Sequence, residues 1–156
     1  MRTLEDIVYD AGEKALTEQE HLVAGIRQRT GTLLAAHALV ASFLGGTTLR
    51  DQGLSTSAWV ALTTLVFGLV IAAILLAPWS LRFVVDARVL YHDLNEQAAS
   101  EKQAGTSDWL VAAGYSHLRL HEQNTASVRR MSSLSGALAA LTVAQTLAWL
   151  TALMVS

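Results

Sequence analysis

The chain has 156 residues, of which 52% are hydrophobic and only 15% are charged, whereas soluble domains carry about 25% charged residues. This composition excludes a disordered chain and disfavours an ordinary water-soluble enzyme. The absence of cysteine excludes disulfide scaffolds and zinc–thiolate sites. A net charge of −2 gives no basic field, so no nucleic-acid partner is predicted.

The first 30 residues are too acidic for a signal peptide, because Asp and Glu supply six of the first 20 residues. Apolar residues recur between these charges at helical spacing, which predicts a cytoplasmic amphipathic helix over residues 1–30. They are Leu4, Ile7, Val8, Ala11, Ala15, Leu22, Val23 and Ile26. No proline follows before the next apolar run, so we expect the helix to continue into it despite Gly25 and Gly31.

Three stretches contain no Asp, Glu, Lys or Arg: residues 31–49, 57–79 and 133–155. Each is long enough to cross a hydrocarbon core of about 30 Å. A buried helix of a soluble bundle would keep a charged stripe on its wet face. The sequence therefore predicts an all-α membrane protein with three transmembrane helices.

Basic residues determine the expected orientation. Ten of the eleven Lys and Arg residues fall on one side of the three spans, and the exception is Arg50 in the first connection. Because Lys and Arg are enriched in cytoplasmic segments, we expect a bacterial inner-membrane location with a cytoplasmic N-terminus and the C-terminus outside.

Residues 80–132 are expected to form a cytoplasmic helical hairpin. Pro78 should end or kink the second span, and Leu81 begins a new apolar stripe at helical spacing. Ser107 or Asp108 can cap the second helix of the hairpin, which then enters the last span. The chain is expected to be a single integrated unit.

His37 is the one ionisable side chain deep within an expected span. An intramembrane histidine facing a bundle interior could gate protons or ions. The alternative is a hydrogen bond to Thr, Ser or a backbone carbonyl of a neighbouring helix.

Small residues follow one another at intervals of four along the last span, at Gly136, Ala140, Ala144 and Ala148. Such a stripe lets helices approach closely in lipid, and the adjacent Gln145 can hydrogen-bond across the contact. We therefore predict a homo-oligomer interface here, although packing against the chain's own spans would use the same residues.

The hairpin carries the predicted ligand-binding residues Arg88, Arg119, His121 and Asn124. Arginines can bind a phosphate of a small anionic ligand or form salt bridges. His117 and His121 share a helical face, but further metal ligands at fixed spacing are missing. No phosphate loop, nucleophile elbow or paired catalytic carboxylates occur, so no enzyme activity, metal or cofactor is predicted.

The layout resembles that of the Pycsar-type transmembrane effectors, small multi-span proteins of bacterial anti-phage systems. The likeness lies in the entry to the first span, Arg29 to Leu34 (RTGTLL), in Pro78-Trp79 at the end of the second, and in the hairpin before a last C-terminal span. The acidic residue and lysine common in that family before this motif are replaced here by Arg27-Gln28-Arg29.

The resemblance implies a membrane effector in antiviral defence, triggered by a cyclic nucleotide bound on the cytoplasmic helices. We accordingly predict a protein that self-associates and permeabilises the inner membrane. Two other functions stay open: a passive membrane anchor or scaffold for a cytoplasmic partner, and a small ion channel that uses His37.

Overall fold

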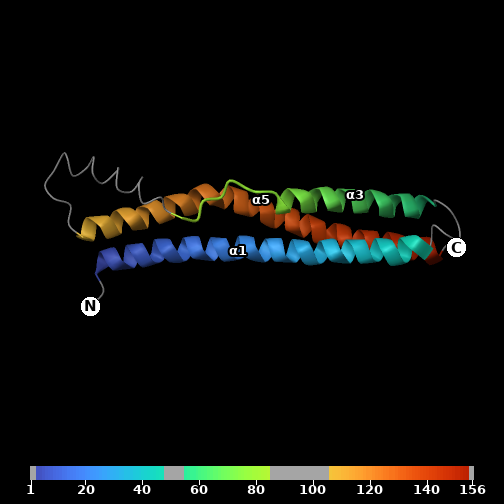
Figure 1. Cartoon of the computed structure of the whole chain (residues 1–156), viewed down its shortest axis with the longest axis horizontal. Helices are drawn as coiled ribbons and strands as arrows, with labels where there is room; N and C mark the ends of the chain where they lie inside the picture. Colours follow the sequence, from blue (N-terminus) through green and yellow to red (C-terminus); the bar gives the residue numbers. More distant parts are fainter. Residues whose placement is uncertain (1–2, 48–54, 85–105, 155–156) are drawn as a thin grey trace. The chain divides into compact units, whose positions relative to one another are not determined.

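The computed structural model describes residues 3–47, 55–84 and 106–154. Within these ranges the protein is all-helical and contains no strand. The elements are the α-helix α1 (Leu4–Val40), a π-helical turn η1 (Ala41–Gly45), and the α-helices α3 (Thr56–Leu76) and α5 (Thr106–Met154) (Figure 1). The predicted all-α fold is therefore confirmed for the described part.

Helix α1 begins with a reciprocal cap. The backbone N–H of Thr3 donates to Asp6 Oδ2 over 3.0 Å, and the backbone N–H of Asp6 donates to Thr3 Oγ1 over 3.3 Å. This pairing satisfies backbone donors that a helix N-terminus leaves free. The helix then runs without a break through Gly25 and Gly31, which confirms the expected continuity with the apolar run.

Helix α3 ends where proline predicts. Ala77 adopts φ −58° and ψ 152°, the extended conformation that a following proline imposes on its neighbour. The helix ends at Leu76, two residues before Pro78, as the proline predicted, and the bounds 57–79 of the expected span stay a prediction. At the other end, Ser55 accepts a hydrogen bond from the Ala58 N–H over 3.2 Å and caps the helix.

The chain after Pro78 is not helical as far as Val84, so the helix expected to start near Leu81 is absent from the described part of this segment. The side chain of Asn124 explains the extended path. Its Oδ1 accepts from the Arg82 N–H over 3.3 Å, and its Nδ2 donates to the Arg82 carbonyl over 2.8 Å. One amide thus satisfies both backbone groups of Arg82, which removes the need for a helical turn there.

Helix α5 starts at Thr106, slightly before the expected caps Ser107 and Asp108, and continues without interruption to Met154. The first helix of the expected hairpin falls mostly on residues 85–105, outside the described residues. The second helix of the hairpin and the last apolar segment form one helix, as expected.

The chain divides into two compact units. Unit 1 comprises Met1–Val23 and Trp79–Arg129, and unit 2 comprises Ala24–Pro78 and Arg130–Ser156. Helices α1 and α5 contribute to both, while α3 belongs to unit 2. The expectation of a single integrated unit stays a prediction.

Buried positions on α1 and α5 follow a seven-residue repeat. On α1 they alternate at intervals of four and three residues, and on α5 they fall on the same repeat. The buried positions of α1 are Gly12, Leu16, Gln19, Val23, Ile26, Thr30 and His37, and those of α5 are Gly114, Asn124, Val128, Met131, Leu138, Gln145, Trp149 and Ala152. This spacing is that of helices packed side by side as in a coiled coil.

The repeat corrects the expected apolar stripe of residues 1–30. Leu4, Ile7 and Leu22 are 74%, 52% and 58% exposed, whereas Leu16 and the polar Gln19 are 4% exposed. Val23 and Ile26 of the expected stripe are buried, at 4% and 8% exposure, so the buried face of α1 overlaps the expected stripe only in part.

Helices α1 and α5 run in the same direction within each unit (Figure 1). Residues that hydrogen-bond between them are 102 to 106 positions apart in unit 1 and 105 to 108 apart in unit 2. A separation this constant requires parallel helices. Helix α3 runs opposite to both, because its early residues Ala58 and Ala61 share a buried cluster with Trp149 and Ala152 near the end of α5.

Candidate functional site

A buried polar layer centred on His37 lies inside unit 2. The His37 side chain is fully buried, and its Nδ1 lies 2.9 Å from Thr142 Oγ1. The Thr142 hydroxyl also donates to the Leu138 carbonyl over 2.9 Å. Since a hydroxyl has one hydrogen, both contacts are satisfied when His37 carries its proton on Nδ1 and donates to Thr142.

The opposite edge of the His37 ring faces α3. A Cβ built on Gly68 would collide with Nε2 and Cδ2 of His37, so the ring rests directly against the glycine. Among the described residues, Nε2 has no hydrogen-bond partner. The predicted hydrogen bond of His37 to a neighbouring helix is confirmed, and the ring is clamped between Thr142 and Gly68.

We expect Thr142→Val to lower the free energy of unfolding by about 1 kcal/mol, because it keeps the shape of the side chain and leaves both ring nitrogens of His37 unpaired. The control is Thr146→Val, since the Thr146 hydroxyl only donates to the Thr142 carbonyl of its own helix. Thermal unfolding of the detergent-purified chain measures the difference, and equal melting temperatures for the two variants would contradict the layer.

Gln145 belongs to the same layer. Its side chain is fully buried, and its Nε2 donates to the His37 carbonyl over 3.4 Å. Gln145 thus bonds to α1 of its own chain, which is the intramolecular alternative that the sequence left open for this stripe. Helix α5 turns this residue toward α1 because position 145 belongs to the buried seven-residue repeat.

The small residues of the predicted interface divide between two environments. Gly136, Ala140 and Ala144 are exposed, and a Cβ on Gly136 would meet open space. Ala148 is half-buried and packs against the cluster that contains Trp149. The first three residues thus form a small-residue face of α5, covered by no described part of the chain, and Ala148 does not belong to it.

Three of the four predicted ligand-binding residues, Arg119, His121 and Asn124, are described, and all three lie on α5 in unit 1. Arg119 is exposed, and Arg88 lies outside the described residues. The Nδ1 of His121 lies 3.2 Å from the Ala15 carbonyl of α1, while Asn124 holds the backbone of Arg82. His121 and Asn124 thus each contact the backbone of another segment of unit 1, and the ligand site stays a prediction.

Two glycines bring α1 and α5 close together in unit 1. A Cβ on Gly12 would lie 2.6 Å from the Gly114 carbonyl oxygen, and a Cβ on Gly114 would lie 3.0 Å from backbone atoms of Val8.

The ring of His117 packs edge-on against Tyr9, with centroids 5.5 Å apart. Among the described residues, no three His, Asp or Glu side chains gather as a metal-binding group.

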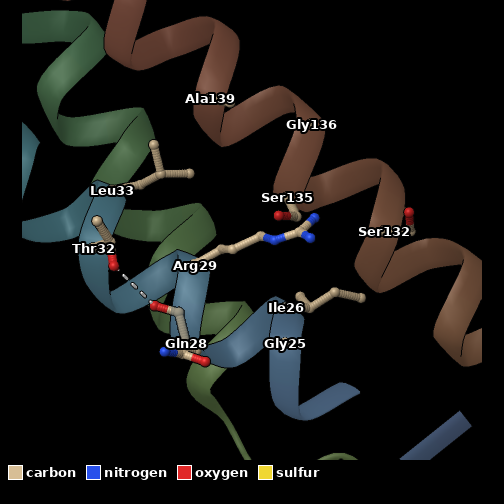
Figure 2. A pocket seen from close by; sticks show the side chains of 10 residues that line it. All are labelled: Gly25, Ile26, Gln28, Arg29, Thr32, Leu33, Ser132, Ser135, Gly136 and Ala139. Carbon is tan, nitrogen blue, oxygen red and sulfur yellow. Dashed lines mark hydrogen bonds between the residues drawn. The ribbon is translucent and has the colours of Figure 1, made fainter. Parts of the chain in front are cut away.

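A groove of about 770 Å³ lies between α1 and α5 in unit 2. Figure 2 shows the Arg29 side chain extended from α1 toward Ser135 of α5 across this groove. Its lining residues are Gly25, Ile26, Gln28, Arg29, Thr32, Leu33, Ser132, Ser135, Gly136 and Ala139. Arg29 contributes to the predicted orientation and to the RTGTLL motif of the family resemblance, but the groove itself was not predicted from the sequence.

Two of the described helices are long and apolar enough to cross a membrane, namely α3 and the Trp109–Met154 part of α5. The described part of the first expected span, residues 31–47, is divided between α1 and η1 and is not among them. The chain matches no protein-family model, no curated protein and no solved structure.

Proposed function

We propose that unit 2 is embedded in a membrane and that the chain crosses the bilayer three times, at residues 31–49, 57–79 and 133–155. The exposed face of α3 supports this, because large apolar side chains gather on it. They are Trp59, Val60, Val66, Phe67, Leu69, Val70 and Ile74. Only 22% of the most apolar 18-residue stretch of α3 is buried inside the protein. This exposure of apolar side chains favours lipid over water as the surrounding solvent.

The pairing of α1 with α5 supports the first crossing. His37 lies beside Thr142, and Gly45 lies against the ring of Trp149. Residues 37–45 therefore run alongside the apolar part of α5. If α5 crosses the bilayer, this stretch must cross with it at the same depth.

The parallel course of α1 and α5 also supports the proposed orientation. Parallel spans enter the bilayer from the same side, and both helices carry two arginines before their apolar part, at Arg27, Arg29, Arg129 and Arg130. Arginine is enriched on the cytoplasmic side. We accordingly place the N-terminus in the cytoplasm and the C-terminus outside a bacterial inner membrane.

The observation that carries the functional proposal is the exposure of Ala140 and Ala144, the part of the small-residue face outside the groove lining, on a helix that would meet lipid. Small side chains let two helices approach within van der Waals contact, which is the main source of helix association in a bilayer. We propose that the same face of a second copy packs here. The chain then acts without catalysis, by assembling in the membrane and perturbing it.

The double variant Ala140→Leu/Ala144→Leu is expected to lower the cross-linked oligomer by about tenfold, or about 1.4 kcal/mol, because the leucines hold the helices apart. The matched control is Ala35→Leu/Ala38→Leu, which alters two exposed alanines of α1. Cross-linking in native membranes measures the oligomer. Equal yields of cross-linked oligomer for the two double variants would show that the small-residue face is not the interface.

Membrane perturbation is tested in the same cells with a membrane-potential dye, with and without added cyclic nucleotides. The effector proposal, whose cyclic-nucleotide trigger and antiviral role derive from the family resemblance alone, expects depolarisation by the wild-type chain and none by the Ala140/Ala144 double variant. If the wild-type chain oligomerises but never depolarises the cell, the membrane anchor becomes the better proposal.

A further inference from the structure

The groove between α1 and α5 changes character along its length. Figure 2 shows the guanidinium of Arg29 between the two helices, with the hydroxyls of Ser132 and Ser135 on the α5 side. Further along the helices the lining is mostly apolar, with Leu33, Gly136 and Ala139, and the Thr32 hydroxyl there donates to the Gln28 carbonyl of its own helix over 3.3 Å. One end of the groove therefore offers a cation and hydroxyl groups, and the other end offers hydrocarbon.

The charge of Arg29 has no acidic counterpart among the described residues of unit 2. The ranges Ala24–Pro78 and Arg130–Ser156 contain four arginines and a single acidic residue, Asp51. Asp51 lies in the connection that follows the end of α1, 22 positions beyond Arg29. The described residues of unit 2 include no Asp or Glu, so an anion that pairs with Arg29 must come from elsewhere.

We propose that this groove binds an anionic phospholipid of the cytoplasmic leaflet. The inference rests on the proposed membrane crossing, which puts Arg29 at the headgroup level and Leu33 in the hydrocarbon. The phosphate accepts hydrogen bonds from the guanidinium of Arg29 and the hydroxyl of Ser135, since arginine suits phosphate oxygens. An acyl chain follows Leu33 and Ala139. Basic pockets between membrane helices commonly hold anionic headgroups.

The polar end of the groove argues against a helix of a second copy as its occupant. The last apolar segment of α5 carries no charge after Arg130. Covering Arg29 with such a helix would remove its guanidinium from water without providing an anion, which is costly. A phospholipid supplies the anion and the hydrocarbon together.

The test counts lipids bound to the full-length chain by native mass spectrometry in a neutral detergent, with phosphatidylglycerol, phosphatidylcholine or inorganic phosphate as the probe. We expect phosphatidylglycerol to bind in preference to phosphatidylcholine. Arg29→Gln should weaken phosphatidylglycerol binding roughly five- to tenfold. Arg27→Gln removes the same charge two residues away, outside the groove lining, and should change binding by less than about twofold.

A second variant fills the apolar end. Gly136→Leu adds its side chain where a Cβ meets nothing within 4 Å, so it should block the acyl chain without disturbing the fold. If Arg29→Gln fails to fold, loss of phosphatidylglycerol binding by Gly136→Leu tests the proposal on its own.

Equal loss of phosphatidylglycerol binding in the Arg27 and Arg29 variants would overturn the lipid site, and so would equal binding of the two lipids. Competition by inorganic phosphate at millimolar concentration would also overturn it, because it would indicate a site for free anions. A loss of cross-linked oligomer in Arg29→Gln with unchanged lipid binding would assign the groove to a second copy. Failure of the membrane proposal itself can be distinguished from failure of the lipid site, because the wild-type chain would then stay monodisperse without detergent.

Discussion

Replacing Gly12 with alanine is expected to lower the free energy of unfolding by about 2 kcal/mol, whereas the same change at Gly25 should raise it by up to about 1 kcal/mol. Both glycines lie inside α1, where alanine is the better helix former. They differ in what surrounds them. A Cβ on Gly25 meets nothing within 4 Å, but a Cβ on Gly12 would lie 2.6 Å from the Gly114 carbonyl oxygen and 3.0 Å from His117 Cβ.

The cost at Gly12 is large because a backbone atom stands in the way. A long side chain could rotate aside, but the Gly114 carbonyl is part of α5 and moves only with the helix. Separating the helices would also strain the bonds of Gln19, whose Nε2 donates to the His121 carbonyl over 3.0 Å and to Thr125 Oγ1 over 3.1 Å. The effect of Gly12→Ala therefore extends along the contact.

Thermal unfolding of the detergent-purified chain should show a melting temperature about 4 to 8 °C lower for Gly12→Ala. Amide hydrogen exchange locates the loss, which should fall on the buried contact of α1 with α5 in unit 1. Equal stability of the Gly12 and Gly25 variants would show that the two helices do not approach at the glycines.

The all-helical fold was predictable from sequence because the strongest signals are compositional. Charge-free runs indicate apolar helices, and Pro78 ends α3 by constraining Ala77, a local steric effect that needs no knowledge of tertiary packing. The continuity of α1 was predictable for the same reason, since no proline interrupts it and its glycines are tolerated in a helix.

The buried face of α1 and α5 was not predictable from hydrophobicity, because many of its positions are polar or glycine. Gln19, Thr30 and His37 occupy α1 positions that an apolar pattern search rejects, while the apolar Leu22 is exposed. A search for a seven-residue repeat that accepts small and polar residues would have found the face. It would also have turned Gln145 inward, where the structure places it.

The π-helical turn shows why such a repeat still needs the structure. The seven-residue repeat places Leu44 at the buried position after His37, yet the residue that lies against the ring of Trp149 is Gly45. A Cβ built on Gly45 would lie 3.0 Å from Cζ2 of Trp149. The turn η1 adds a residue to the local helical period and rotates Gly45 into that place. The bonds of Asn124 to the backbone of Arg82 were not predictable for a different reason, because a polar side chain on a charged helix gives no sign of which backbone group it binds.

Gly68→Ala is expected to cost about 2 to 3 kcal/mol of stability, because the added methyl group would occupy the space of the His37 ring. The ring cannot swing away, since its Nδ1 is held by Thr142 and the side chain is fully buried. The matched control is Gly31→Ala, where a Cβ meets nothing within 4 Å. Thermal unfolding in detergent should separate the two variants by about 4 to 12 °C.

A double-mutant cycle with His37→Ala distinguishes a specific clash from general damage to α3. Removing the ring opens space beside Gly68, so Gly68→Ala should cost less than about 0.5 kcal/mol in that background, although His37→Ala itself destabilises the chain. The expected coupling energy is therefore about 2 kcal/mol. If the two losses simply add, the imidazole does not lie against Gly68. A coupled result means that one buried side chain sets the distance of α3 from α1 and, through Thr142, joins both helices to α5.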